Sequence, residues 1–163
     1  CSSGQEPYTI SMCAEDATAK TGKSRHVQVI GTDISESILL EAKAAVYSEL
    51  ALSRGLDAQT KSRFFQKAHD GYKLNSNITK NVRFQQFNLL KPFSVLGRFD
   101  IIFCRNVLIY FSDEVKLDIL SRMANSLEPG GYIFLSSTEA MPMSIKELEP
   151  VRDGRVRYFR KVS

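Results

Sequence analysis

The sequence has few of the residues on which several common functions depend. It contains no tryptophan, two histidines (His26, His69) and three cysteines (Cys1, Cys13, Cys104). An odd number of cysteines argues against a disulfide framework, and their spacing matches no zinc-binding template. We therefore expect no metal site and a reducing, cytoplasmic compartment.

Long apolar runs and two nucleotide-binding motifs are also missing. No apolar run approaches the roughly 20 residues that cross a bilayer, so we expect no membrane insertion. The sequence has no P-loop, and no G-x-G-x-x-G run opens its first predicted helix. Neither histidine belongs to an arrangement of serine or cysteine with an acid that would indicate nucleophilic catalysis.

The remaining composition is that of one globular domain. Of the 163 residues, 43% are hydrophobic and 25% are charged, which excludes a disordered or fibrous chain. A net charge of +4 permits an anionic partner without indicating nucleic acid. The basic residues near the C-terminus indicate a solvated strand rather than a binding patch.

Helical and strand-like patterns alternate along the chain, which predicts an α/β fold: a mostly parallel sheet with helices on both faces. Helices are predicted from Pro7 to about residue 20, after Ser35, after Asp57, and from Ser112 to a stop at residues 129–131. Strands are predicted at residues 26–30, 82–87, 99–104, 132–135 and 155–160. The apolar run at 99–104 is typical of a strand buried on both faces. A small β excursion is predicted around 67–82, because Asp70 and Gly71 form a hairpin signal.

Polar residues directly follow three of the predicted strands: Asp33, Asn88 and Asn106. Ligands of such sheets bind beyond the carboxyl ends of the strands. Asp33 could accept hydrogen bonds from ribose hydroxyls, or it could cap a helix or hold a turn. The amides suit an adenine edge or an amino-acid group, although each alone could equally cap a loop.

Four further positions could take part in binding or catalysis. The turn at Ser3 and Gly4 leads into a helix N-terminus, where backbone N–H groups can bind an acceptor. Glu6 lies at the same end, as a ligand contact or as a carboxylate that the helix dipole favours. Arg105 could pair with an anionic substrate. Tyr110 could pack against a bound group, or be a half-buried aromatic before a helix.

Four segments resemble the chemotaxis receptor methyltransferases of the CheR type. They are residues 1–8 (CSSGQEPY), 31–34 (GTDI), 88–90 (NLL) and, most specifically, 99–111 (FDIIFCRNVLIYF). The resemblance covers essentially the whole chain in order. It implies a Rossmann-like fold with a seven-stranded, mostly parallel sheet and S-adenosyl-L-methionine as cofactor. The implied reaction is methyl transfer to glutamate side chains of a methyl-accepting chemotaxis receptor, giving glutamate methyl ester and S-adenosyl-L-homocysteine.

The resemblance also implies a role for each site residue. Ser3 and Gly4 would contact the cofactor, Glu6 would contact its amino-acid part, and Asp33 would contact its ribose. The adenine and methionine portions would be lined by Asn88, Leu89, Asn106 and Val107. Arg105 and Tyr110 would face the substrate glutamate. The partner would be the cytoplasmic domain of the receptor, and the excursion around 67–82 would be a short form of a β-subdomain that helps to dock receptors.

The sequence departs from the family pattern in two places. Gln5 replaces the first glutamate of a Glu-Glu pair, and the chain begins inside the first motif. Residues 1–163 are therefore expected to be a catalytic domain without its first, central strand and without the N-terminal domain that usually precedes it. One alternative is a non-catalytic S-adenosylmethionine-binding signalling module of the same fold. A nicotinamide-dependent oxidoreductase is a weaker alternative, because only Asp33 supports it.

Overall fold

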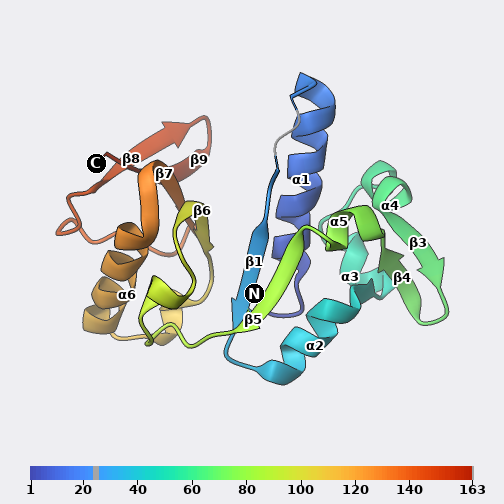
Figure 1. Ribbon diagram of the computed structural model, residues 1–163, viewed down its shortest axis with the longest axis horizontal. Coiled ribbons are helices and arrows are strands. Elements are labelled where there is room, and N and C mark those ends of the chain that lie inside the picture. The colour runs from blue at the N-terminus through green and yellow to red at the C-terminus, as the bar shows by residue number, and fades with distance from the viewer. Residues whose placement is uncertain (24–25, 163) are drawn as a thin grey trace. The chain divides into compact units, whose positions relative to one another are not determined.

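The computed structural model describes residues 1–23 and 26–162 (Figure 1). The chain divides into two compact units, Cys1–Asn88 and the residues from Leu89 onward, and each is described here by itself. Within the described residues, no helix is both long and apolar enough to cross a membrane.

The first unit is built around a pair of parallel strands. Strand β1 (Val29–Asp33) pairs with β5 (Val82–Gln86), and Asp33 lies opposite Gln86. Helices α1 (Gln5–Thr21) and α2 (Glu36–Ala44) both pack against these strands, and α1 also contacts α5 (Ser76–Thr79). The predicted cap of α2 is confirmed, because the Ser35 hydroxyl accepts the N–H of Ile38 at 3.4 Å.

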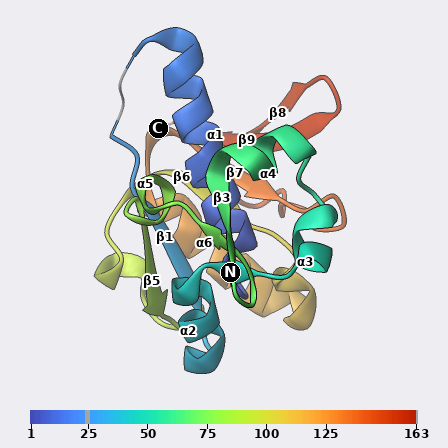
Figure 2. The same cartoon turned by 90° about the vertical axis from the view of Figure 1, so that its right-hand side faces the viewer.

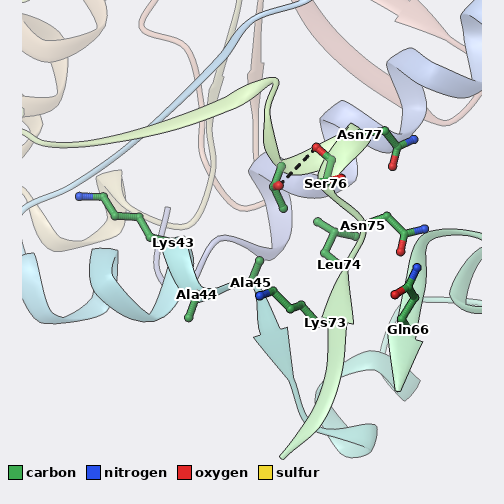
Figure 3. A pocket seen from close by; sticks show the side chains of 10 residues that line it. Lys43, Ala44, Ala45, Gln66, Lys73, Leu74, Asn75, Ser76 and Asn77 are labelled. Carbon is green, nitrogen blue, oxygen red and sulfur yellow. Dashed lines mark hydrogen bonds between the residues drawn. The ribbon is translucent and has the colours of Figure 1, made fainter. Parts of the chain in front are cut away.

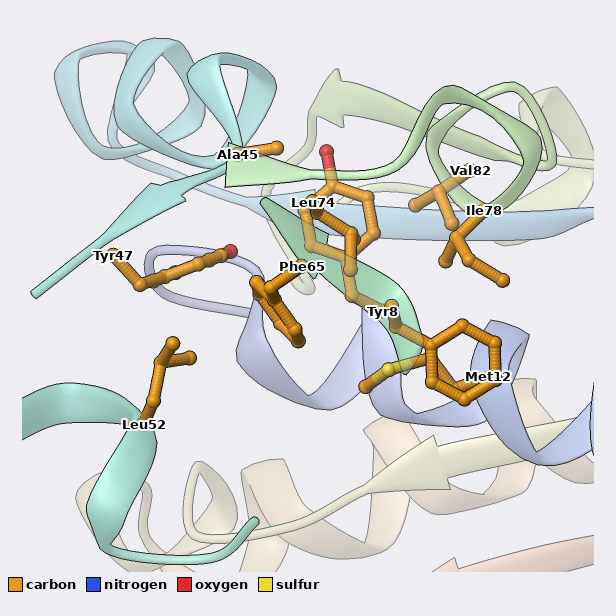
Figure 4. Close-up of a cluster of buried hydrophobic side chains, with 10 residues drawn as sticks. Tyr8, Met12, Ala45, Tyr47, Leu52, Phe65, Leu74, Ile78 and Val82 are labelled. Atoms are coloured by element: carbon orange, nitrogen blue, oxygen red, sulfur yellow. The ribbon is translucent and has the colours of Figure 1, made fainter. Parts of the chain in front are cut away.

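A cluster of apolar side chains forms the core of this unit (Figure 4). Tyr8 and Met12 of α1 pack there against side chains from the strands, and Ile78 of α5 is fully buried. Burying one such side chain stabilises the fold by about 1.5–3 kcal/mol. The Tyr8 hydroxyl donates to the Ala42 carbonyl at 2.9 Å, and burial raises the pKa of Tyr8 to about 12. The first turn of α1 is thereby fixed against the last turn of α2.

A small antiparallel sheet completes the first unit (Figures 1 and 2). Its strand order is β2 (Val46–Tyr47), β4 (Gly71–Leu74), β3 (Phe65–Ala68), with α3 (Glu49–Ser53) and α4 (Ala58–Phe64) between β2 and β3. The predicted hairpin at Gly71 is confirmed. Gly71 has a φ of 137°, and a Cβ there would collide with the Tyr47 carbonyl, so the turn requires glycine. The sheet spans residues 46–74, and residues 76–82 form α5 and the start of β5.

The second unit is a four-stranded sheet of order β6-β7-β9-β8. Its strands are β6 (Phe99–Cys104), β7 (Leu127–Leu135), β8 (Leu148–Asp153) and β9 (Val156–Lys161). Only β6 and β7 run parallel. Helix α6 (Asp113–Ser126) joins β6 to β7, and the short helices η1 (Phe93–Val95) and η2 (Leu108–Tyr110) flank β6. Three of these strands overlap predicted ones, whereas β8 was not predicted.

Two central strand pairs are parallel, as the sequence predicts: β1 with β5, and β6 with β7. Two other expectations are wrong. Strand β6 is not buried on both faces: Ile101 is 48% exposed and Phe103 38% exposed. Those two side chains share one face, and the opposite face ends in the buried Cys104. The apolar run therefore indicated a strand but not how deeply it is buried.

The second correction concerns residues 129–131, which were expected to end the helix. Helix α6 already ends at Ser126, and these residues lie inside β7. Gly130 has a φ of 79°, and the β6–β7 register shifts between Phe99 and Ile101, opposite this segment. The proline and glycines therefore form an irregularity in the strand instead of a helix stop.

Candidate functional site

In the first unit, Asp33 is fixed at the carboxyl end of β1 by backbone donors. Its Oδ2 atom accepts the N–H of Ser2 at 2.9 Å. Its Oδ1 atom accepts the N–H of Ser35 at 3.1 Å. The carboxylate thus ties the turn before α1 to the end of β1, which is the turn-holding role that the sequence left open.

These hydrogen bonds also keep Asp33 ionised. Burial raises the pKa of Asp33, but the backbone hydrogen bonds from Ser35 and Ser2 lower it, and the pKa lies below its ordinary value. A carboxylate has about four lone-pair positions, and the N–H groups of Ser2 and Ser35 use two of them. Asp33 therefore keeps the capacity to accept a hydrogen bond from a hydroxyl.

The turn at Ser3 and Gly4 leaves the start of α1 without a side-chain cap. Gly4 is buried with a φ of 87°, and a Cβ there would lie 3.0 Å from Ala42 Cβ and 3.0 Å from Phe84 Cζ. Only glycine fits this turn, which brings the N-terminus of α1 close to α2 and β5. Glu6 is half-buried in the first turn of the helix. An uncapped helix N-terminus is a site where an acceptor can bind.

Asn88 follows β5 at the same end of the strand pair as Asp33. The N–H of Phe87 donates to the Asp33 carbonyl at 2.9 Å, which continues the β1–β5 pairing by one residue. Asn88 is the next residue and is half-buried. The structure thus places the predicted residues Ser3, Gly4, Glu6, Asp33 and Asn88 around one end of one strand pair.

In the second unit, the predicted residues lie on the segment that follows β6. Arg105, Asn106 and Tyr110 are exposed, and Tyr110 is exposed by 79%. Asn106 has a φ of 58°, a left-handed conformation that asparagine tolerates better than most residues. Val107 is half-buried and directly precedes η2. Along this segment, the two predicted cofactor residues, Asn106 and Val107, therefore lie between the two predicted substrate residues, Arg105 and Tyr110.

A residue that sequence reasoning missed, Glu139, holds this segment in place. Its side chain is buried, at 7% exposure, beyond the end of β7. The carboxylate accepts the N–H groups of Asn106, Val107 and Leu108 at 3.0, 3.1 and 2.8 Å. It also accepts the N–H and the hydroxyl of Ser136 at 3.1 and 2.6 Å. The rule that selected Asp33, a carboxylate shortly after a strand, could have selected Glu139.

Arg122 of α6 is a second missed residue, and it holds the predicted cofactor residue Leu89. Its Nη1 atom donates to the carbonyls of Leu89 and Lys91 at 2.8 and 2.7 Å. Its Nε and Nη2 atoms donate to Asp118 Oδ2 at 3.0 and 2.5 Å, and the guanidinium lies 5.0 Å from the centre of the Phe93 ring. In the sequence, Arg122 is indistinguishable from an ordinary surface arginine paired four residues back.

A pocket of about 780 Å³ lies elsewhere in the first unit (Figure 3). It is lined by residues of α2, β3, β4 and α5, including Lys43, Lys73 and Asn75. None of the predicted cofactor or substrate residues lines it. Across the described part of the chain, no group of three or more His, Cys, Asp and Glu residues could hold a metal ion.

An α/β fold with ligand-binding groups at the carboxyl ends of parallel strands defines a Rossmann-like domain. A solved structure shares this fold: the N-methyltransferase NodS from Bradyrhizobium japonicum, in complex with S-adenosyl-L-homocysteine. It matches 83% of this chain and 67% of its own chain, with a TM-score of 0.51 and 16% identity. The predicted fold class is thereby confirmed: a Rossmann-like methyltransferase fold.

The family follows from sequence comparison. The protein-family model described as "CheR methyltransferase, SAM binding domain" matches residues 1–157, and the chain belongs to that family. A chemotaxis protein methyltransferase of Vibrio parahaemolyticus is 46% identical over 153 residues, which are 93% of this chain and 56% of the relative. Chemotaxis protein methyltransferase 1 of Pseudomonas aeruginosa is 48% identical over 145 residues, 86% of this chain and 53% of the relative. The chain thus spans about half the length of these relatives.

The family confirms the resemblance and the cofactor, S-adenosyl-L-methionine. The residues of the first unit fit its chemistry. Asp33 is ionised and can accept from a ribose hydroxyl, the α1 N-terminus can bind a carboxylate, and Glu6 can pair with an amino group. Which residues contact the cofactor stays a prediction.

Proposed function

We propose that this chain is the cofactor-binding part of an enzyme that methylates glutamate side chains of a chemotaxis receptor. The products would be a glutamate methyl ester and S-adenosyl-L-homocysteine, and the reaction would take place in the cytoplasm on the cytoplasmic domain of a methyl-accepting receptor. The observation that carries the proposal is the family match over residues 1–157, together with 46% and 48% identity to chemotaxis protein methyltransferases.

We assign cofactor binding to eight residues: Ser3, Gly4, Glu6, Asp33, Asn88, Leu89, Asn106 and Val107. Three hydrogen bonds support the assignment. The N–H of Ser2 donates to Asp33. Glu139 accepts the N–H of Asn106, and Arg122 donates to the carbonyl of Leu89. When bound, S-adenosylmethionine supplies a methyl group on a sulfonium, and the chemistry of activation belongs to the cofactor.

The proposed reaction requires no general base from the protein. A glutamate side chain has a pKa near ~4.3, so the acceptor is already an anion at pH 7 and needs no general base. What the chain must do is orient the acceptor and exclude water, and positioning of this kind contributes up to roughly 7–11 kcal/mol.

Arg105 and Tyr110 are proposed to orient the acceptor carboxylate. Both side chains are exposed on the segment after β6, where a large substrate can reach them. A peripheral contact with Arg105 suits the reaction better than a close ion pair, because a close pair would make the carboxylate a weaker nucleophile. The Tyr110 hydroxyl can donate to one carboxylate oxygen and leave the other available.

The test uses S-adenosylmethionine with a tritiated methyl group and the soluble cytoplasmic domain of a chemotaxis receptor. We expect label in the receptor that alkali releases as methanol, since a glutamate methyl ester is labile to base. Alkali-stable label would contradict the proposed ester. Cofactor binding with no transfer to any receptor domain would favour the alternative, a non-catalytic signalling module of the same fold. A receptor domain whose glutamates are replaced by glutamine is the matched control.

A further inference from the structure

Glu139 is a buried carboxylate surrounded only by hydrogen-bond donors. Five hydrogen bonds converge on its two oxygens: three from consecutive backbone N–H groups, and two from the N–H and hydroxyl of Ser136. The three consecutive donors belong to residues 106–108, more than 30 positions earlier in the chain. A single side chain therefore ties that segment to the residues that follow β7, beyond the last β6–β7 pair of Cys104 and Leu135.

The surroundings require a carboxylate at this position. An ionised carboxylate only accepts hydrogen bonds, whereas an amide of the same shape must present an NH₂ group in place of one oxygen. Oε1 faces the N–H groups of Val107 and Leu108, and Oε2 faces those of Asn106 and Ser136. Either orientation of an amide would set donor against donor at two backbone groups. Burial would raise the pKa of Glu139, but its hydrogen bonds to Ser136, Asn106 and Leu108 outweigh burial and lower it.

The segment that Glu139 holds has an unusual backbone. Asn106 adopts a left-handed conformation with a φ of 58°. Its N–H group and the next two all point at one carboxylate, and η2 begins directly afterwards. Without the carboxylate, three buried or half-buried donors would lose their acceptor.

We propose that Glu139 is a positioning residue of the methyltransferase, which fixes the backbone of residues 106–108 so that Asn106 and Val107 meet the cofactor and Tyr110 meets the acceptor. The inference rests on the proposed function, since it takes the roles of those residues from there. Glu139 itself touches neither the cofactor nor the substrate. Its effect passes through the backbone amides of the segment.

The experiment compares the wild-type chain, Glu139→Gln, and the matched control Glu147→Gln, an exposed glutamate of the same unit. Amide hydrogen exchange, measured by NMR, reports whether the backbone N–H groups of residues 106–108 are hydrogen-bonded, and it needs no cofactor. We expect exchange in Glu139→Gln to accelerate at least roughly 10-fold either at Val107 and Leu108 or at Asn106, according to which side the NH₂ group takes, while amides in β7 and β9 keep wild-type rates. That factor corresponds to one lost hydrogen bond of about 1.4 kcal/mol.

Calorimetric titration with S-adenosylhomocysteine, below the unfolding temperature of each variant, measures the effect on cofactor affinity. Glu139→Gln should bind roughly 10- to 100-fold more weakly, with the KM for S-adenosylmethionine raised in step. A merely structural role would lower the unfolding temperature and leave these constants unchanged, which would overturn the inference. Unchanged exchange at residues 106–108 would overturn it as well. Failure of the wild-type chain to bind would instead count against the proposed function.

Ser136→Ala is a milder variant for the case in which Glu139→Gln does not fold. It removes the 2.6 Å hydrogen bond from the Ser136 hydroxyl and leaves the carboxylate and its backbone donors in place. We expect a roughly 2- to 5-fold weaker binding of S-adenosylhomocysteine and a small acceleration of exchange at Asn106, which shares Oε2 with that hydroxyl. Wild-type values for both would overturn the inference.

Discussion

Replacing Asp33 by asparagine tests whether this carboxylate binds the ribose of the cofactor. The change keeps the shape of the side chain and removes its charge. In the structure, the N–H groups of Ser2 and Ser35 donate to the two oxygens of Asp33, at 2.9 and 3.1 Å. An asparagine amide must turn its NH₂ group toward either Ser2 or Ser35, so at least one of these bonds is lost whichever way the amide points.

The size of the effect follows from the charge on the acceptor. A hydrogen bond to a charged group contributes about 1.5–3 kcal/mol, so losing the bond from a ribose hydroxyl should weaken S-adenosylhomocysteine binding roughly 10- to 150-fold. The loss of the backbone bond adds a stability cost that is not specific to the ligand. Glu36→Gln, an exposed glutamate in the first turn of α2, is the control and should bind like the wild-type chain.

A thermodynamic cycle separates the two effects. Calorimetric titrations compare S-adenosylhomocysteine with its 2′-deoxy analogue on the wild-type chain and on Asp33→Asn. If Asp33 binds the ribose, the wild-type chain should discriminate strongly between the two ligands, and the variant should bind them nearly equally. Equal discrimination by both proteins would refute the ribose contact and leave Asp33 with its turn-holding role alone.

Four further predictions concern other residues. Tyr110→Phe should lower methyl transfer roughly 10-fold without changing S-adenosylhomocysteine affinity, and unchanged turnover would contradict the orienting role. Gly31→Ala should lower the free energy of unfolding by about 1–3 kcal/mol in urea titrations, because its Cβ would lie 2.8 Å from a packed aromatic ring. Gly55→Ala, where a Cβ meets nothing within 4 Å, should cost nothing, and equal costs at the two glycines would refute the packing argument. Arg122→Met should destabilise by about 1–3 kcal/mol and speed amide exchange around residue 89, whereas wild-type exchange would show that the loop is held otherwise. In acid titrations, the stability difference between wild type and Glu139→Gln should be full above about pH 4.3 and shrink as pH falls through the lowered pKa of Glu139, and a difference that does not change with pH would contradict the account.

Local signals in the sequence predicted much of the first unit. The caps at Ser35 and Asp57 and the hairpin at Gly71 each depend on residues within a few positions, and all three are confirmed. Helix caps and hairpin turns of this kind can be predicted from a single sequence, because they depend on neighbouring residues. The position of Asp33 at the end of a strand could be anticipated, because ligands of such sheets bind at strand ends. Its hydrogen bond with Ser2 was not predicted.

The parts that the sequence did not predict depend on partners far along the chain. Glu139 receives donors from residues 31–33 positions away, and no local pattern marks it as buried. The exposed face of β6 depends on which strands and helices cover it, whereas the run of apolar residues shows only that it is a strand. Gly130 could equally end a helix or kink a strand, and pairing with β6 decides in favour of the strand.

The central claim is that this chain binds S-adenosylmethionine through the residues named above. Calorimetric titration of the 163-residue chain with S-adenosylhomocysteine tests it most directly, with NAD as the comparison ligand. The account predicts one site with a dissociation constant in the micromolar range, a marked loss in Asp33→Asn, and no binding of NAD. Affinity that is unaffected by Asp33→Asn, or a preference for NAD, would contradict it.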